Sequence, residues 1–199
     1  MTEETSEWLA SRRGFDPNVY EPAEDSQLLL ARCRADIDAA ERVLEVGTGS
    51  GYVAAGLAEE TGATISGVDI NPYACRRTKE AGIEVIRGTL TSAFRAGHFD
   101  VVVFNPPYLP SEGASSETDW FARAVDGGPG GLAVTVAFLE DLPRVLASDG
   151  RGYLLVSSLM ARDRLHRTVQ STDFHRHILG EPVHYGDETL AVWRLDRCE

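Results

Sequence analysis

Residues 105–108, Asn-Pro-Pro-Tyr, have the composition of a site for a flat nitrogen-bearing group. They follow the apolar run Val101–Phe104, so a buried strand would deliver them to one edge of a sheet. The Asn105 side-chain oxygen and the Pro106 carbonyl accept hydrogen bonds, and neither Pro106 nor Pro107 contributes an N–H donor. Tyr108 adds an aromatic face for stacking. The alternative is an ordinary turn after a strand, which Asn-Pro often begins.

A second group of residues suits a cofactor. Gly47, Gly49 and Gly51 form a turn between an expected strand and helix, where a ligand can lie against the backbone beside the positive helix end. Asp69 ends the next strand, where a carboxylate accepts hydrogen bonds from ribose hydroxyls. Glu45 would repel a diphosphate, but it suits the ammonium and sulfonium of S-adenosylmethionine. The alternative is a glycine turn that only closes a strand–helix junction.

Apolar segments of strand length alternate with segments of helix length along most of the chain. This alternation indicates an α/β, Rossmann-like fold with a mostly parallel, seven-stranded sheet and helices on both faces. The last two strands are separated by a short turn, so we expect an antiparallel strand near one edge. We expect strands at 42–46, 63–70, 83–88, 99–104, 151–158, 176–183 and 189–195, and helices at 22–37, 52–60, 71–82, 130–147 and 160–171.

Length and composition favour one domain. The chain has 199 residues, of which 43% are hydrophobic, enough to bury a core. Residues 1–18 are polar and irregular, so we expect a flexible arm there and a single domain over residues 19–199. No apolar run reaches the roughly 20 residues of a membrane span, and the first residues lack the apolar core of a secretion signal.

The cysteines and histidines give no indication of a metal site. Cys33, Cys75 and Cys198 lie far apart, which disfavours a disulfide framework or structural zinc and fits a cytoplasmic location. His175 and His177 could share one face of a strand, but no third ligand is apparent. We therefore expect no metal.

The chain is acidic, with a net charge of -12, and Lys79 is the single lysine among 19 basic residues. An acidic surface with so little lysine is typical of a halophilic chain adapted to high salt. A GC-rich coding sequence is the alternative reason for the arginine bias. In either case the basic stripe of an autonomous nucleic-acid-binding protein is missing.

Four segments together resemble a known family. VLEVGTGSG (43–51), VDINPYA (68–74) and NPPY (105–108) are similar to motifs of class I S-adenosylmethionine-dependent methyltransferases that act on a planar amide or amine nitrogen. VYEPAEDSQLLL (19–30) resembles the release factor glutamine methyltransferases, in particular their archaeal and eukaryotic branch. The resemblance covers residues 18–195. NPPY alone is shared with DNA and RNA adenine methyltransferases, so YEPAEDS is the more family-specific segment.

The resemblance implies methyl transfer from S-adenosylmethionine to the side-chain amide nitrogen of glutamine in the Gly-Gly-Gln loop of a translation release factor. That nitrogen is a poor nucleophile because its lone pair is delocalised into the carbonyl. Asn105 and the Pro106 carbonyl would bind its two hydrogens, while Tyr108 would stack on the amide. The sulfonium already activates the methyl group, so alignment is expected to carry the rate effect without a general base. The implied catalytic residues are Asn105, Pro106, Pro107 and Tyr108.

The same resemblance implies a cofactor pocket. Tyr20, Glu21 and Asp25 would close over the methionine part or the substrate. An N-terminal helix cap and staple is the alternative for Glu24 and Asp25. Relatives commonly carry an acidic residue that contacts the adenine amino group, whereas this chain has Thr89 there and the backbone around Leu90 would supply the contact instead. The implied cofactor-binding residues are Ser26, Glu45, Gly47, Gly49, Gly51, Asp69, Ile70, Thr89, Leu90 and Asn105.

The resemblance also implies partners. Members of this branch associate with a small zinc-binding activator protein. The strand Ile83–Gly88 would lie at a sheet edge with little protection against pairing. We therefore expect a heterodimer in which the activator adds a strand to this edge. Trp120 and residues 126–131 are expected to shape the rim of the substrate groove, although simple packing is the alternative for Trp120.

Three other functions stay open. Adenine N6 methylation of DNA or RNA would use the same loop, but it predicts a basic groove or a target-recognition domain that this acidic chain lacks. Protein lysine methylation is a second alternative. A non-catalytic, cofactor-binding subunit is the third, and the intact NPPY segment argues against it.

Overall fold

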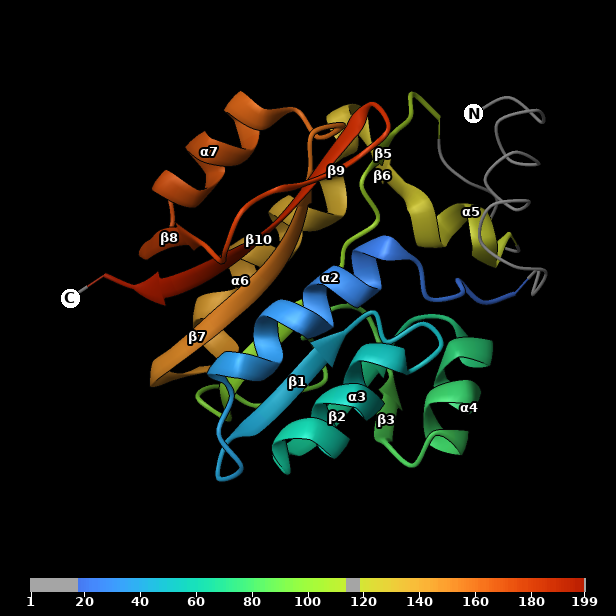
Figure 1. Ribbon diagram of the computed structural model, residues 1–199, viewed down its shortest axis with the longest axis vertical. Coiled ribbons are helices and arrows are strands. Elements are labelled where there is room, and N and C mark those ends of the chain that lie inside the picture. Colours follow the sequence, from blue (N-terminus) through green and yellow to red (C-terminus); the bar gives the residue numbers. More distant parts are fainter. Residues whose placement is uncertain (1–17, 114–118, 199) are drawn as a thin grey trace.

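The computed structural model describes residues 18–113 and 119–198 (Figure 1). Of the predicted arm, residues 1–18, only Asn18 falls within these ranges. Over the described part of the chain, no helix is both long and apolar enough to cross a membrane. The helices are α2 (Glu24–Cys33), η1 (Arg34–Asp36), α3 (Tyr52–Thr61), α4 (Pro72–Glu80), α5 (Trp120–Val125), η2 (Pro129–Gly131), α6 (Ala133–Val145) and α7 (Arg162–Gln170). The strands are β1 (Arg42–Val46), β2 (Thr64–Asp69), β3 (Glu84–Arg87), β4 (Phe99–Phe104), β5 (Leu109–Pro110), β6 (Asp126–Gly128), β7 (Leu146–Ser157), β8 (Phe174–Ile178), β9 (Val183–Tyr185) and β10 (Glu188–Arg197).

One sheet contains eight strands of the described chain. Its order is β3–β2–β1–β4–β7–β10–β8, and β9 pairs with β10 outside this path. β1 pairs in parallel with β2 and β4, β2 with β3, and β4 with β7. β10 runs antiparallel to β7, β8 and β9. The predicted α/β Rossmann-like fold with an antiparallel strand near one edge is therefore confirmed.

The observed elements differ from the expected ones in several places. The sheet has eight strands where seven were expected, β7 begins at Leu146 and not at residue 151, and the helix expected at 22–37 is α2 followed by η1. The strand expected at 176–183 is two strands, β8 and β9, because Gly180 with φ 68° and Pro182 interrupt it. The helix expected at 130–147 begins later, at Ala133, since Gly130 and Gly131 have positive φ. The short elements α5, β5 and β6 between β4 and α6 were not expected.

Helices cover both faces of the main sheet. Figure 1 shows α2 and α3 in front of the sheet and α6 behind it, while α3 also contacts α4 and α6 contacts α7. The central strands are apolar throughout because both of their faces are covered: Val101–Phe104 of β4 are all buried. Leu44 of β1, Phe138 of α6 and Leu154 of β7 are fully buried in the same core.

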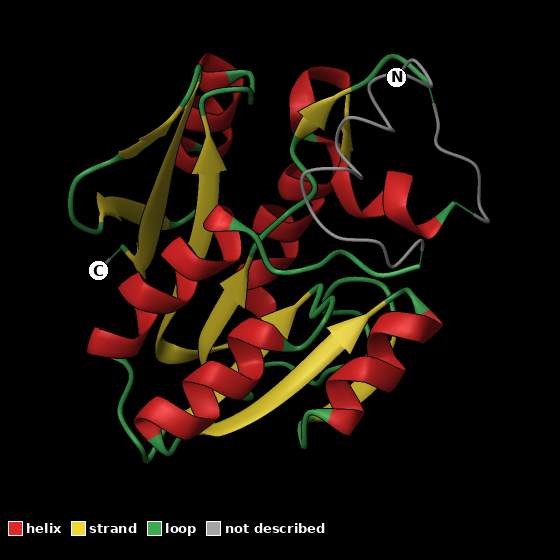
Figure 2. Cartoon of the chain, turned by 45° about the vertical axis from the view of Figure 1, so that its right-hand side comes forward, coloured by secondary structure: helices red, strands yellow, loops and turns green. Residues whose placement is uncertain are grey.

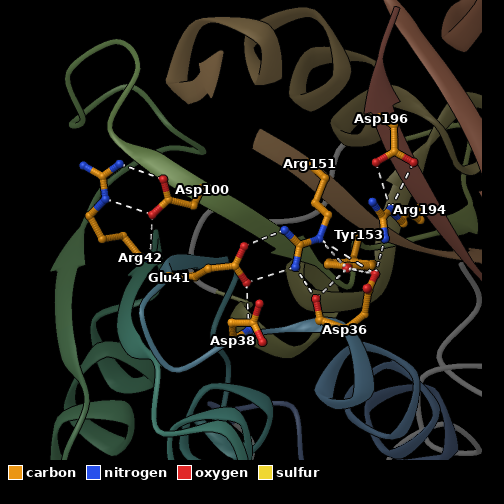
Figure 3. A network of polar contacts seen from close by, with 9 residues as sticks. All are labelled: Asp36, Asp38, Glu41, Arg42, Asp100, Arg151, Tyr153, Arg194 and Asp196. Atoms are coloured by element: carbon orange, nitrogen blue, oxygen red, sulfur yellow. Dashed lines mark hydrogen bonds and ion pairs between the residues drawn. The ribbon is translucent and has the colours of Figure 1, made fainter. Parts of the chain in front are cut away.

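Charged side chains form a network at the edge of the sheet where the parallel strands begin (Figure 3). Arg42 at the start of β1 donates hydrogen bonds of 2.9 and 2.7 Å to the Asp100 carboxylate of β4. Arg151 of β7 donates bonds of 2.6 and 2.9 Å to the two Glu41 oxygens. The other members of this network are Asp36, Asp38, Tyr153, Arg194 and Asp196. Pairing of carboxylates with guanidinium groups thus closes the amino end of the sheet.

Candidate active site

A cavity of about 660 Å³ opens at the other edge of the sheet, where the parallel strands end. Figure 2 shows strand arrowheads pointing toward this side, where loops connect strands to helices. Ligands bind at this edge in open α/β sheets because the loops that follow the strands converge there. The lining includes these residues singled out from the sequence: Ser26, Glu45, Gly47, Gly49, Asp69, Ile70, Thr89, Leu90, Asn105, Pro106, Pro107 and Tyr108.

The glycine-rich turn lies against the ends of β1 and β2. The Gly47 N–H donates to the Val68 carbonyl (2.8 Å), and the Gly49 N–H donates to an Asp69 carboxylate oxygen (2.9 Å). Gly47 has φ +65°, and a Cβ there would lie 3.3 Å from the Phe104 ring. The turn therefore lines the cavity with backbone, and Asp69 fixes it from β2.

Gly51 is the exception among the predicted cofactor-binding residues, because it does not line the cavity. It is the N-cap of α3 with φ 81°, and a Cβ there would lie 3.0 Å from the Thr78 Cα of α4. A left-handed backbone favours glycine, and the missing side chain lets α3 and α4 approach. Close packing of α3 on α4 is therefore sufficient to explain the third glycine of the turn.

Two carboxylates line the cavity beside the glycine turn, the buried Glu45 and the half-buried Asp69. Glu45 is 3% exposed and accepts a 2.9 Å hydrogen bond from the Ala54 N–H in the first turn of α3. Asp69 accepts hydrogen bonds from the N–H groups of Gly49 and Asn71. Burial raises the pKa of both carboxyls, and the Asp69 charge adds to the effect at Glu45. Neither carboxylate forms a salt bridge within the described ranges, so this part of the cavity favours a cationic ligand.

Asn105 follows β4 and brings a buried acceptor to the cavity. Among the residues that the structure describes, its side-chain oxygen Oδ1 has no hydrogen-bond partner. A buried amide oxygen left unpaired costs about 1–3 kcal/mol, so an N–H group of a ligand would relieve this cost. Pro106 and Pro107 line the cavity beside it, and Tyr108 is 4% exposed. The loop has the acceptor-rich character that its composition indicates.

Residues 126–131 support the backbone of this loop. β5, which follows Tyr108, pairs with β6. A Cβ on Gly127 would lie 2.7 Å from the Pro107 carbonyl oxygen, and a Cβ on Gly131 would lie 2.2 Å from the Tyr108 carbonyl oxygen. Glycine is therefore required where the two segments approach so closely.

The loop after β3 carries backbone strain at the cavity. Thr89 and Leu90 line it, as does Ile70 at the end of β2. Leu90 has φ 48°, and it is the one non-glycine residue with positive φ in the described ranges. Such strain typically costs about 1–3 kcal/mol and concentrates at ligand sites. Arg144 of α6 holds the loop by donating a 2.9 Å hydrogen bond to the Thr91 carbonyl.

The segment before α2 divides between two environments. Tyr20 and Asp25 line the cavity, whereas Glu21 forms an ion pair with Arg77 of α4 and is not part of the lining. The N-cap of α2 is Ala23, without a side-chain hydrogen bond, so Asp25 lies in the first turn and not at the cap position. Asp25 instead accepts a 2.7 Å hydrogen bond from the Tyr20 hydroxyl.

α5 supplies part of the wall that the sequence analysis missed. Arg123 and Val125 line the cavity together with the expected Trp120, and the Arg123 guanidinium lies 5.1 Å from the Trp120 ring centroid. The Asp119 side chain caps the helix by accepting a 2.9 Å hydrogen bond from the Ala122 N–H. Asp119 before an apolar segment was therefore a usable N-cap signal.

The fold and this cavity define a class I methyltransferase: a Rossmann-like sheet with a glycine turn, a carboxylate at the end of β2 and a loop rich in hydrogen-bond acceptors, all where the parallel strands end. Residues 20–175 match the methyltransferase small domain family, and the chain belongs to it. It is accordingly an S-adenosylmethionine-dependent N-methyltransferase. The backbone-lined turn and the two carboxylates fit this cofactor, which carries ribose hydroxyls and positive charge.

Named relatives span the same region. The chain is 38% identical over 189 residues to a Methanocaldococcus jannaschii protein named as a protein N5-glutamine methyltransferase, covering 90% of this chain and 93% of the relative. It is 28% identical over 210 residues to the eRF1 methyltransferase catalytic subunit mtq2 of Schizosaccharomyces pombe, covering 90% of each. Among solved structures, the E. cuniculi Mtq2–Trm112 complex, described as methylating the eRF1 translation termination factor, matches with a TM-score of 0.75. That match has 25% identity and covers 90% of this chain and 99% of the other.

Proposed function

We propose that this chain methylates the side-chain amide nitrogen of a glutamine in the Gly-Gly-Gln loop of a translation release factor. The observation that carries the proposal is the buried Asn105 Oδ1, which lacks a partner within the described residues. An amide nitrogen brings hydrogens to such an acceptor, whereas a group with neither N–H nor O–H leaves it unsatisfied. Relatives named as a protein N5-glutamine methyltransferase and an eRF1 methyltransferase support this choice of substrate.

For the cofactor, we assign the backbone of Gly47 and Gly49 to close contact, Asp69 to the ribose hydroxyls and Glu45 to the positively charged part. When bound, S-adenosylmethionine supplies a methyl group already activated by its sulfonium. The strained backbone at Leu90 would contact the adenine in place of an acidic side chain. The proposed cofactor-binding residues are Ser26, Glu45, Gly47, Gly49, Asp69, Ile70, Thr89, Leu90 and Asn105.

The loop after β4 contributes alignment. Asn105 Oδ1 and the Pro106 carbonyl each accept one amide hydrogen, which turns the nitrogen lone pair toward the methyl group. With S-adenosylmethionine bound, the lone pair would form the new N–C bond, the sulfur would keep the electrons of its bond to the methyl group, and one N–H proton would leave to solvent. Pro107 stiffens the loop and Tyr108 holds the plane of the amide. Positioning of this kind accounts for rate enhancement without a dedicated base.

A methyl-transfer assay tests this function. The full chain, with labelled S-adenosylmethionine, should label a release factor and leave its Gly-Gly-Gln→Gly-Gly-Ala variant unlabelled. Equal labelling of both factors would reject the glutamine assignment. Labelling of adenine in DNA or RNA, with none in the factor, would favour the rival function instead.

We further propose that residues 19–199 act as one domain whose free sheet edge receives a small zinc-binding activator. β3 is the end strand of the sheet and pairs with β2 within the described chain. Its Ile86 is 47% exposed, and an end strand presents unpaired backbone N–H and C=O groups to a partner strand. The solved Mtq2–Trm112 assembly of a relative supports a partner of this kind.

Two exposed isoleucines at opposite sheet edges make a matched test. Ile86→Lys on β3 should reduce co-purification of the activator, because a buried lysine in the interface would be unpaired. Ile178→Lys on β8 changes a side chain that is 44% exposed at the other edge and should leave co-purification unchanged. If the Ile86→Lys variant still co-purified with the activator, or if both variants lost the activator equally, an interface on β3 would be contradicted.

A further inference from the structure

We propose that Asp25 is a positioning residue that fixes Tyr108 beside the target nitrogen. This inference rests on the proposed methyl transfer. Asp25 lies in the first turn of α2, is 2% exposed and lines the cavity. A carboxylate buried this deeply must have its lone pairs satisfied, so its hydrogen-bond partners define its role.

The two carboxylate oxygens of Asp25 face different groups. Oδ2 accepts a 2.7 Å hydrogen bond from the Tyr20 hydroxyl. It also accepts a longer one, of 3.4 Å, from the Tyr108 hydroxyl. Oδ1 accepts from the Ser26 N–H at 2.7 Å and from the Ser26 hydroxyl at 3.2 Å. One side chain therefore holds a residue of the NPPY loop and a residue of the α2 motif.

The contact with Tyr108 links segments that are far apart in the sequence. The backbone of Tyr108 packs closely against Gly131, where an added Cβ would lie 2.2 Å from the Tyr108 carbonyl oxygen. Asp25 acts at the opposite end of the same residue, on the phenol. A phenol held at both ends keeps the direction of its Cβ–Oη axis, and the place of the ring sets where an amide can stack on it. Release of the hydroxyl end should therefore lower the rate of transfer more than the affinity for cofactor.

A double-mutant cycle tests this link. Asp25→Asn, Tyr108→Phe and the double variant are prepared in the full chain, and kcat and KM are measured with the release factor. We expect each single variant to lower kcat about tenfold and the double variant to lose about tenfold as well, because each substitution already removes the contact between the Asp25 carboxylate and the Tyr108 hydroxyl. The Kd for S-adenosylhomocysteine, measured by calorimetry, should stay within about threefold of wild type in all three.

The same measurements identify the alternatives. A loss of about a hundredfold in the double variant would mean that Asp25 and Tyr108 act independently, which overturns the inference. A rise in Kd of more than about tenfold with Asp25→Asn in both backgrounds would make Asp25 a direct cofactor ligand and overturn it too. Asp149→Asn, an exposed aspartate after α6, is the matched control and should behave as wild type.

A structural readout separates this inference from the proposed function. Absence of transfer by the wild-type chain would reject the release factor as substrate without testing Asp25. A crystal structure of Asp25→Asn with S-adenosylhomocysteine needs no substrate, and we expect the Tyr108 ring to be displaced in it relative to the wild-type complex. An unmoved ring would overturn the role of Asp25 whatever the substrate is.

Discussion

Carboxylates have opposite roles at the two ends of the parallel strands, called here the amino edge, where the strands begin, and the carboxyl edge, where they end. At the amino edge, hydrogen bonds from arginine lower the pKa of Glu41 and Asp100. At the carboxyl edge, burial raises the pKa of Glu45 and Asp69, and within the described ranges no basic side chain forms a salt bridge with either. Paired carboxylates stabilise the folded chain near neutral pH, whereas buried ones without a cation weaken it.

This difference shows where the chain trades stability for function. The amino edge joins β1, β4, β7 and β10 through charges that are satisfied by the protein itself (Figure 3). The carboxyl edge holds the buried Asn105 Oδ1 and the strained Leu90, which a ligand would compensate. Changes at the carboxyl edge should therefore affect transfer, and changes at the amino edge should affect stability.

The largest effect is expected for Asn105→Ala. Loss of the acceptor should lower kcat by about 100- to 1,000-fold, the range seen when one preorganised hydrogen-bonding group is removed from an active site. The variant also loses an unpaired buried oxygen, so its free energy of unfolding should stay within about 1 kcal/mol of wild type. Methyl-transfer kinetics and urea unfolding measure the two quantities. An unchanged kcat, or a large fall in the free energy of unfolding, would contradict the claim that the carboxyl edge serves transfer and the amino edge serves stability.

Gly131→Ala perturbs the same loop through its backbone. A Cβ would lie 2.2 Å from the Tyr108 carbonyl oxygen at a residue with φ +67°, so the loop must shift. We expect kcat to fall by about 10- to 100-fold, since displacements of about 1 Å are sufficient for such losses.

Gly186→Ala separates this effect from backbone strain. Gly186 has φ +60° with nothing within 4 Å of an added Cβ, so the substitution introduces strain without a clash. Its kcat should stay near wild type. An equal fall in kcat for Gly131→Ala and Gly186→Ala would show that backbone strain, and not the position of the loop, limits methyl transfer.

Arg151→Met tests the amino edge. Arg151 is 13% exposed and bonds to both Glu41 oxygens, so its removal should lower the free energy of unfolding by about 1–3 kcal/mol, less than for a fully buried pair. Transfer at temperatures where the variant is folded should be unchanged. Arg164→Met, on the exposed face of α7, is the control and should change neither quantity. A fall in kcat with Arg151→Met would contradict the division between the edges.

The smallest effects are expected in the pH dependence of unfolding. Because the folded-state pKa of Glu41 is lowered, its stabilisation is complete above the unfolded pKa of about 4.3 and is lost as the pH falls below it. Glu45 has the opposite sign: its raised pKa gives a contribution that is present below about pH 4.3 and lost as the pH rises through the folded-state pKa. In a plot of the free energy of unfolding against pH, Arg151→Met should therefore flatten the part below about pH 4.3. Glu45→Gln should flatten the part above it. Parallel curves for all three proteins would refute these assignments.

The sequence was sufficient to place the principal groups of the cavity. Gly47, Asp69 and Asn105 each follow an apolar strand, and ends of parallel strands meet at one edge, so spacing alone brings them together. Gly51 shares the glycine pattern but serves helix packing, a distinction that depends on its contact with Thr78.

Other features leave no local pattern to read. α5 spans only Trp120–Val125, which is too short to show a helical repeat of apolar residues. The N-cap residue Asp119 is the one sequence signal that indicates it. The bond from Arg151 to Glu41 and the contact of Asp25 with Tyr108 join residues distant in the sequence, and neither follows from the spacing of residues along one element.

A crystal structure of the chain with S-adenosylhomocysteine and a release-factor peptide containing Gly-Gly-Gln tests the central claim most directly. We predict that the glutamine side-chain nitrogen lies within hydrogen-bonding distance of both the Asn105 Oδ1 and the Pro106 carbonyl oxygen, with the amide against Tyr108. A complex in which the glutamine turns its carbonyl oxygen to Asn105, or lies outside the cavity, would contradict it.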